Sequence, residues 1–222
     1  MIRAEGLSVF FGRTVALDSV DLYVEDGVVG LFGPNGSGKS TLLRVVAGLL
    51  RPSRGSFAFE GVAPESAGEE RRGAVGYAGH HSGLYAHLAL RENLALLARL
   101  HGVERRRVDE VLEQLGLLDH ASAPVVSLSA GYRRRAAVAR ALLHEPRLLL
   151  LDEPYANLDA DATALVSQAI REWRRPDRVA LVATHGAKEL KRWADGGIVL
   201  RRGRVVVSGR YKHEAAAEAR AR

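Results

Sequence analysis

The stretch of sequence that decides the fold is Gly33-Pro34-Asn35-Gly36-Ser37-Gly38-Lys39-Ser40-Thr41. It follows a short apolar run, Val28 to Phe32, of the kind that forms a buried parallel strand. It precedes an amphipathic segment, Leu42 to Leu50, with Pro52 just beyond. A glycine-rich turn between a strand and a helix lets backbone N–H groups surround an anion. We call residues 33–41 the phosphate loop, because the pattern predicts that they bind phosphate groups.

Two side chains at the end of this loop have the chemistry that a nucleoside triphosphate requires. Lys39 would reach the β- and γ-phosphates, and the Ser40 hydroxyl would coordinate Mg²⁺. The chain has 28 arginines but only four lysines, so composition alone does not explain a lysine here. A compact ammonium also suits this position better than a planar guanidinium. The alternative, a glycine-rich turn without a ligand, is disfavoured because strand and helix patterns flank the loop.

Composition narrows the class of protein. The 222 residues, 47% of them hydrophobic, suffice for one sizeable α/β domain. The absence of cysteine excludes disulfides, thiolate metal sites and a nucleophilic thiol. The net charge of +6 is spread over several arginine runs without a nucleic-acid-binding module, so no nucleic acid is expected as a partner. No secretion signal and no membrane-spanning apolar stretch is evident, and a cytoplasmic location is expected.

The remaining sequence alternates between strand and helix signals. Strands are expected at residues 7–11, 20–24, 56–61, 74–78, 148–151 and 178–183, with a terminal hairpin from 198 to 207. Helices are expected at residues 42–50, 88–100, 108–115, 132–143 and 160–173. A polar connection is expected at residues 62–73, and a short helix or frayed end at residues 211–222.

These signals predict an α/β fold made of a single domain, residues 1–222. The early alternating strands predict an antiparallel β subdomain packed beside the phosphate-binding core. The break in strand signals over residues 83–127 predicts an inserted helical subdomain. We therefore expect the core and β subdomain at residues 1–82 and 145–222, and the helical subdomain at about 83–144.

Two later strands end in polar residues. The apolar run 148–151 leads into Asp152-Glu153, and the strand near residue 180 leads into Thr184-His185. Because parallel strands end at one edge of a sheet, these side chains are expected near the phosphates. Asp152 would hold the Mg²⁺ shell, Glu153 would orient or deprotonate the attacking water, and His185 would contact the γ-phosphate or the water. The alternatives are a surface acidic pair before Pro154 and a structural histidine.

A second candidate anion site lies at Leu128-Ser129-Ala130-Gly131-Tyr132, immediately before a helix. Small residues with free N–H groups at a helix start bind anions. Two anion sites in one chain suggest that two subunits share each nucleotide. The alternative is an ordinary helix capped by Ser129.

The order and spacing of these motifs resemble those of the ATP-binding subunits of ABC transporters over essentially the whole chain. The resemblance implies a P-loop NTPase core, ATP and Mg²⁺ as cofactors, transport-coupled ATP hydrolysis, and a nucleotide-sandwich dimer. It also implies integral membrane transporter subunits as partners, a position on the inner face of the cell membrane, and no direct contact with the cargo.

The resemblance assigns roles to further residues. Phe11 matches the aromatic residue that stacks on adenine, which a ring face suits. Ser129 and Gly131 match the signature that contacts the γ-phosphate bound to the opposite subunit. The loop Ala156-Asn157-Leu158-Asp159 matches the segment that links the two sites. His80 stands where the family usually has a glutamine that couples nucleotide to the membrane subunit, close to Mg²⁺.

Three residues depart from the family pattern: His80 replaces that glutamine, Ala130 replaces a glycine, and Tyr132 replaces a glutamine. Alanine fits if its φ is helical, and histidine still donates or accepts hydrogen bonds. Gly79-His80 and the Leu-Ser-Ala-Gly signature are most similar to the heme-exporter branch, which serves cytochrome c maturation.

Other functions are also compatible with some of these motifs. An export ATPase for another substrate or a soluble ATPase of metal-cluster assembly would share these motifs. A genome-maintenance ATPase would need long coiled-coil insertions or two heads, for which the chain has no room. A regulatory pseudo-ATPase is disfavoured because Lys39, Asp152, Glu153 and His185 are all present.

Overall fold

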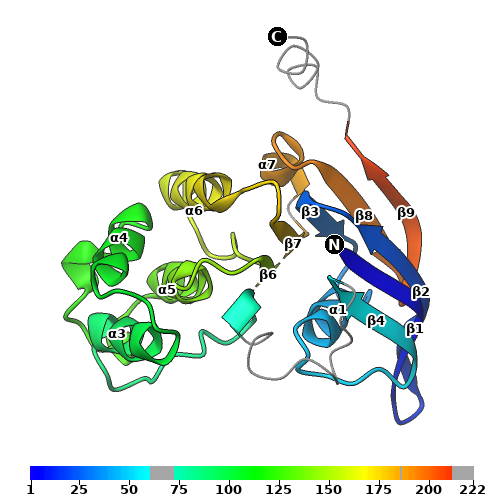
Figure 1. The fold of residues 1–222 in the computed structure, drawn as a ribbon, viewed down its shortest axis with the longest axis horizontal. Coiled ribbons are helices and arrows are strands. Elements are labelled where there is room, and N and C mark those ends of the chain that lie inside the picture. Colours follow the sequence, from blue (N-terminus) through cyan, green and yellow to red (C-terminus); the bar gives the residue numbers. More distant parts are fainter. Residues whose placement is uncertain (61–72, 186, 212–222) are drawn as a thin grey trace.

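The structure is a computed structural model that describes residues 1–60, 73–185 and 187–211. Two sheets form its framework (Figure 1). The first is antiparallel, with the order β2 (Thr14–Val24), β1 (Ile2–Phe11) and β4 (Arg54–Phe59). The second has the order β5 (Val75–Ala78), β6 (Leu148–Asp152), β7 (Val179–Ala183), β3 (Gly27–Phe32), β8 (Gly196–Arg201) and β9 (Arg204–Arg210).

The second sheet is parallel from β5 to β8, and only β9 runs antiparallel, paired with β8. Strands β3, β6 and β7 are buried along their whole length, as their continuous apolar sequences predict. Because side chains alternate between the two faces of a strand, β6 serves two cores. Leu149 and Leu151 pack into the core on the helical side, whereas Leu148 and Leu150 pack into the core shared with the antiparallel sheet.

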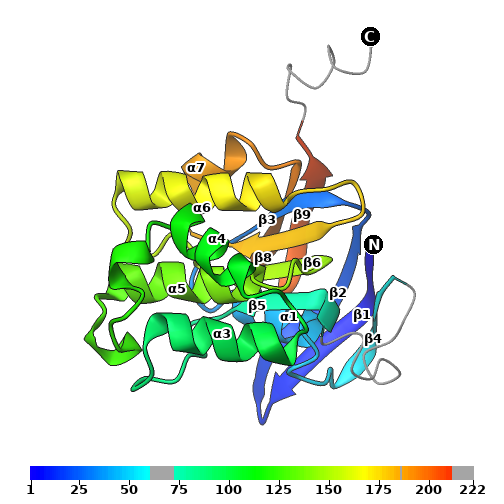
Figure 2. The ribbon, with the colours of Figure 1, turned by 60° about the vertical axis from the view of Figure 1, so that its left-hand side comes forward.

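Helices cover the parallel sheet on both faces (Figures 1 and 2). Helix α1 (Lys39–Val46) lies between the two sheets, and its buried leucines and valines join the core of the antiparallel sheet. On the other side lie the helices α3 (Leu90–Leu100), α4 (Arg106–Gln114), α5 (Ala130–Leu142) and α6 (Ala160–Trp173). Shorter helical segments include η1 (Leu118–His120), η2 (Val125–Ser127) and α7 (Ala187–Lys191).

The sequence-based expectations for the sheets are confirmed, including the antiparallel β subdomain and the terminal hairpin. The segment from residue 83 to 129, all of it described, holds helices and an isolated bridge between Ala89 and Pro124 instead of a strand–helix alternation. The boundaries proposed for the helical subdomain stay a prediction. The polar connection expected at 62–73 lies almost wholly outside the described residues, and so does the tail after Tyr211.

Helix α6 has the expected bounds, and the ends of α3, α4 and α5 differ from the expected ones by at most two residues. The helix after the phosphate loop differs most. The segment expected at residues 42–50 is helical over Lys39–Val46. It begins earlier because Gly38 provides the left-handed residue that precedes the first turn, with φ 106°. It ends earlier because Gly48, with φ 74°, turns the chain away. Lys39 therefore stands in the first turn of the helix.

Candidate functional site

The phosphate loop is the turn between β3 and α1, and its shape depends on glycine. Gly33 and Gly38 have φ of 148° and 106°, in the region that side chains disfavour. A Cβ atom on Gly33 would lie 2.2 Å from the Leu200 carbonyl oxygen, and one on Gly38 would lie 2.6 Å from the Ala16 carbonyl oxygen. The loop is therefore held between β2 and the end of β8, and only glycine fits at these two positions.

The polar groups of this loop suit an anion. Lys39 is buried, and its Nζ donates hydrogen bonds to the carbonyls of Gly33 at 2.8 Å and Pro34 at 3.1 Å. The Ser37 hydroxyl is buried and has no hydrogen-bond partner among the described residues. No side chain caps the start of α1, where Ser40 follows Lys39, so first-turn N–H groups remain for a ligand. An orphaned hydroxyl, an ammonium and an uncapped helix start together fit phosphate oxygens.

The turn between β8 and β9 supports the loop from outside. The Gly203 N–H donates to the Ser37 carbonyl at 3.0 Å, and the Gly203 carbonyl accepts from the Asp18 N–H at 2.9 Å. The hairpin was expected from the sequence, but this contact was not. Gly203 lies 166 residues after Ser37 in the chain, and nothing in the sequence indicates that the two residues will meet.

The ends of β6 and β7 form the second part of the candidate site, which we call the carboxylate edge: Asp152, Glu153 and His185. Asp152 is buried and pairs in register with Ala183. The Glu153 carboxylate lies 2.9 Å from Nδ1 of His185 and accepts a 3.4 Å hydrogen bond from the His185 backbone N–H. The Glu153 side chain is 23% exposed and that of His185 is 68% exposed, so this pair faces solvent.

Glu153 adopts an unusual backbone conformation. Its φ is 53°, in the left-handed region. Its N–H donates to the Ala183 carbonyl at 2.8 Å, and its own carbonyl accepts from the Ala156 N–H at 3.1 Å. A non-glycine residue persists in this conformation where surrounding contacts fix it, and such residues concentrate at functional sites.

His80 lies at the end of β5, the strand next to β6. Its imidazole is exposed, and its ring contacts His81 edge-on with centroids 5.4 Å apart. The link between its loop and the carboxylate edge comes from another residue, Arg134 of α5. Arg134 Nη1 donates to the Gly79 carbonyl at 3.0 Å and to the Asp152 carbonyl at 3.3 Å. Sequence reasoning missed Arg134, because it stands in a run of three arginines without a distinguishing pattern.

The second anion candidate lies at the start of α5. Ser129 is exposed and caps the helix, since its Oγ accepts a 3.3 Å hydrogen bond from the Tyr132 N–H. Ala130 is the first residue of the helix, so it has the helical backbone conformation that an alanine needs at this position. A Cβ on Gly131 would lie 2.9 Å from the Asn157 carbonyl oxygen. The structure therefore brings the signature glycine against the loop 156–159 of the same chain.

Tyr132, one of the departures from the family pattern, packs inside the helical region. Its ring lies 3.9 Å from the His120 ring, centroid to centroid, and the Arg135 guanidinium stands 4.5 Å from the Tyr132 centroid. These contacts explain how the tyrosine is accommodated. They fix the side chain toward η1 of its own chain.

Phe11 ends β1 and is 51% exposed. It pairs with Thr14, two residues before Ala16, whose carbonyl lies against Gly38 of the phosphate loop. The hairpin that carries Phe11 thus adjoins the phosphate loop, and the ring is accessible to a ligand.

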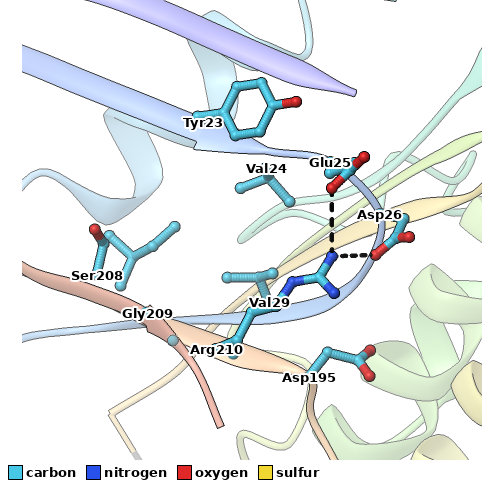
Figure 3. Close-up of a pocket in the computed structure, with 12 residues that line it drawn as sticks. Tyr23, Val24, Glu25, Asp26, Val29, Asp195, Ser208, Gly209 and Arg210 are labelled. Carbon is cyan, nitrogen blue, oxygen red and sulfur yellow. Dashed lines mark hydrogen bonds and ion pairs between the residues drawn. The ribbon is translucent and has the colours of Figure 1, made fainter.

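A cavity of about 230 Å³ lies at the opposite end of the parallel sheet, near the start of β3 and β8 (Figure 3). There Arg210 pairs with Asp26 at 2.6 Å and with Glu25 at 3.9 Å, and Asp195 lies on the other side. None of the site residues expected from the sequence lines this cavity. It is separate from the phosphate loop, which stands at the carboxyl end of β3.

Among the described residues, no helix is long and apolar enough to cross a membrane. The phosphate loop and the carboxylate edge both stand at the carboxyl ends of strands in one parallel sheet. This arrangement defines a nucleotide-binding protein of the P-loop α/β class.

Comparison with known proteins narrows the class to a family. The family described as "ABC transporter" matches residues 17–156, more than half of the chain. The chain is 44% identical to the cytochrome c biogenesis ATP-binding export protein CcmA of Xanthomonas axonopodis over 84% of this chain and 87% of that protein. It is 37% identical to a probable sulfate/thiosulfate import ATP-binding protein CysA of Chlorella vulgaris, over 94% and 90%.

A solved structure supports the same family. The dimeric ATP-binding cassette MJ0796, in a post-hydrolysis state bound to ADP and Pi, superimposes with a TM-score of 0.86 and 25% identity, covering 96% of this chain and all of that one. The chain therefore belongs to the ATP-binding subunits of the ABC transporter family, as its motifs predicted.

Proposed function

We propose that this chain binds and hydrolyses ATP to power transport through separate membrane subunits. The observation that carries the proposal is the position of the Glu153–His185 pair at the sheet edge that also carries the phosphate loop. A carboxylate held 2.9 Å from an imidazole, partly exposed, is suited to accept a proton from water. The nucleotide-binding fold of the family supports the reaction class.

Each half of the site would have a separate task. Lys39 would exchange its two carbonyl partners for the β- and γ-phosphates, and the N–H groups of residues 33–41 would hold the remaining phosphate oxygens. Ser40 and Asp152, with His80 at the same edge, would hold Mg²⁺, which supplies positive charge to the phosphates. Phe11 would stack on the adenine ring.

Glu153 would orient the attacking water and take its proton. His185 donates from Nδ1 and from its backbone N–H to one oxygen of Glu153, so the other oxygen is available to the water. Its Nε2 would then face the γ-phosphate, where it could donate when protonated.

The signature would act in a dimer. Ser129 and the start of α5 are exposed, and the uncommitted N–H groups there would bind the γ-phosphate held by a second subunit. The loop at Asn157 touches Gly131, so it would connect this contact with the subunit's own site. The dimeric MJ0796 cassette supports such an arrangement.

The transported substrate is the finer part of the proposal. Among the relatives reported above, the one named for cytochrome c biogenesis has the higher identity, and Gly79-His80 with Ser129-Ala130-Gly131 favours the same branch. We therefore propose heme export for cytochrome c maturation, with the chain bound to membrane subunits at the inner face of the membrane. An ATPase for another substrate is the alternative, since a relative named for sulfate import is also similar.

Two measurements test this function. Purified protein should hydrolyse ATP in the presence of Mg²⁺, and absence of turnover alone and with its partner would refute the enzymatic proposal. Co-purification from solubilised membranes, with the bound protein identified by mass, tests the transport role. Recovery of membrane subunits of a cytochrome c maturation system supports heme export. Recovery of another permease rejects that branch, and recovery of no membrane protein favours a soluble ATPase.

A further inference from the structure

One nitrogen atom joins the two strand ends that carry His80 and Glu153. Arg134 Nη1 donates to the Gly79 carbonyl at 3.0 Å and to the Asp152 carbonyl at 3.3 Å. Gly79 immediately precedes His80, and Asp152 immediately precedes Glu153. Strands β5 and β6 are neighbours in the sheet, which is why a single guanidinium reaches both. Among the described residues, no carboxylate pairs with Arg134, so its partners are backbone carbonyls.

The bond to Asp152 acts on the peptide group that leads into Glu153. The carbonyl of this peptide group accepts from Arg134, and its N–H, which belongs to Glu153, donates to the Ala183 carbonyl at 2.8 Å. The peptide plane is thus held from α5 on one side and from β7 on the other. Directly after it, Glu153 takes its left-handed φ of 53°. A strained conformation of this kind requires contacts that fix its flanking peptides.

We propose that Arg134 is a positioning residue, which holds Glu153 in its strained conformation and sets its place relative to the His80 loop. This inference rests on the proposed function, in which Glu153 activates water. Arg134 also lies on the second turn of α5, whose first turn carries Ser129 and Gly131. If α5 moves when Ser129 and Gly131 contact a second subunit, the Arg134 side chain would transmit that movement to Glu153.

The kinetic test is the Arg134→Gln variant, which removes the guanidinium. Turnover should fall about 10- to 100-fold, because small displacements of a reacting group cost rate of this order. KM for ATP should stay within about twofold, since Arg134 touches no part of the phosphate loop. Arg134→Lys should recover most of the turnover, because an ammonium has three donors for the two carbonyls.

The matched control is Arg140→Gln. Arg140 lies on the same helix and donates to the Tyr77 carbonyl of β5 at 2.6 Å, but it makes no bond to the Asp152–Glu153 peptide. If Arg134 merely docks α5 on the sheet, both variants should lower turnover equally, and that result would overturn the proposal. Turnover of Arg134→Gln within twofold of the wild type would also overturn it.

A second readout needs no nucleotide. In hydrogen–deuterium exchange on the nucleotide-free protein, Arg134→Gln should speed exchange of the Glu153 amide by about tenfold or more. Arg140→Gln should leave that amide unchanged. Because this measurement is independent of hydrolysis, it tests Arg134 even if the wild type proves inactive, and unchanged exchange at Glu153 would overturn the proposal.

Discussion

The phosphate loop and the carboxylate edge meet at one end of the same sheet, yet they are built in different ways. The loop takes all its functional groups from residues 33–41, and two glycines that tolerate close neighbours set its path. The edge joins residues from β6 and β7, 32 positions apart, and depends on α5 for support. The loop is therefore a local device for binding, whereas the edge is a tertiary device whose precision depends on packing.

The difference predicts that damage to the edge changes turnover, and damage to the loop changes affinity. The largest effect is expected for Glu153→Gln, which preserves shape but removes the base. Turnover should fall by roughly 10²–10⁴-fold while ATP still binds. The retained ATP should favour the dimer, which light scattering would detect as a doubled mass. Turnover close to that of the wild type would show that another group takes the proton.

Lys39→Ala tests the phosphate loop. ATP affinity should weaken by about 10- to 100-fold, because a charge-assisted contact to phosphate is lost. Titration calorimetry with ATP measures it, and Glu153→Gln serves as the control that should bind normally. If Lys39→Ala binds ATP as tightly as that control, the phosphate loop does not determine ATP affinity in the way we expect.

His80 is expected to connect the carboxylate edge with the membrane subunit. His80→Ala should keep ATP binding but lose the stimulation of hydrolysis by that subunit, an effect of a few-fold. His80→Gln, the usual family residue, should retain much of the stimulation. His81→Ala, which changes the exposed neighbouring ring, is the control and should behave as the wild type. Unchanged stimulation in His80→Ala would remove the coupling role.

The last prediction concerns stability instead of activity, and it tests the support of β5. The His144 ring stacks on His101, with centroids 4.2 Å apart, and its Nε2 contacts the Val75 carbonyl at 3.2 Å. Burial lowers the pKa of His144 from 6.5 to about 4, and His101 and Arg140 add repulsion. Between these values the unfolded chain binds a proton that the folded chain does not. The free energy of unfolding should therefore have its full value above pH 6.5. It should fall as the pH is lowered toward 4, by at most about 3 kcal/mol.

Urea denaturation of the wild type at pH 7 and pH 5 measures this loss. His144→Gln should reduce the difference between the two pH values, whereas the exposed His81→Ala should leave it unchanged. Equal differences in the wild type and His144→Gln would assign the acid sensitivity to other groups.

Much of the fold was predictable from the sequence, because local patterns controlled it. The four leucines of β6 predicted a strand buried on both faces, and residues 160–173 form helix α6 with the expected bounds. The convergence of Glu153 and His185 also followed from the sequence, since parallel strands end at a common edge. Helix α1 was placed three residues late because the left-handed Gly38 that opens it was counted only as part of the loop.

The sequence by itself determined the family, the phosphate loop and the polar residues at the strand ends, since each depends on neighbours in the chain. Only the tertiary structure decided that Arg134 joins Gly79 to Asp152, that Gly203 supports Ser37, and that Glu153 takes a left-handed φ. The physical reason is that these features depend on the order of strands in the sheet and on how α5 packs against it. Residues brought together by such packing carry no common pattern along the chain.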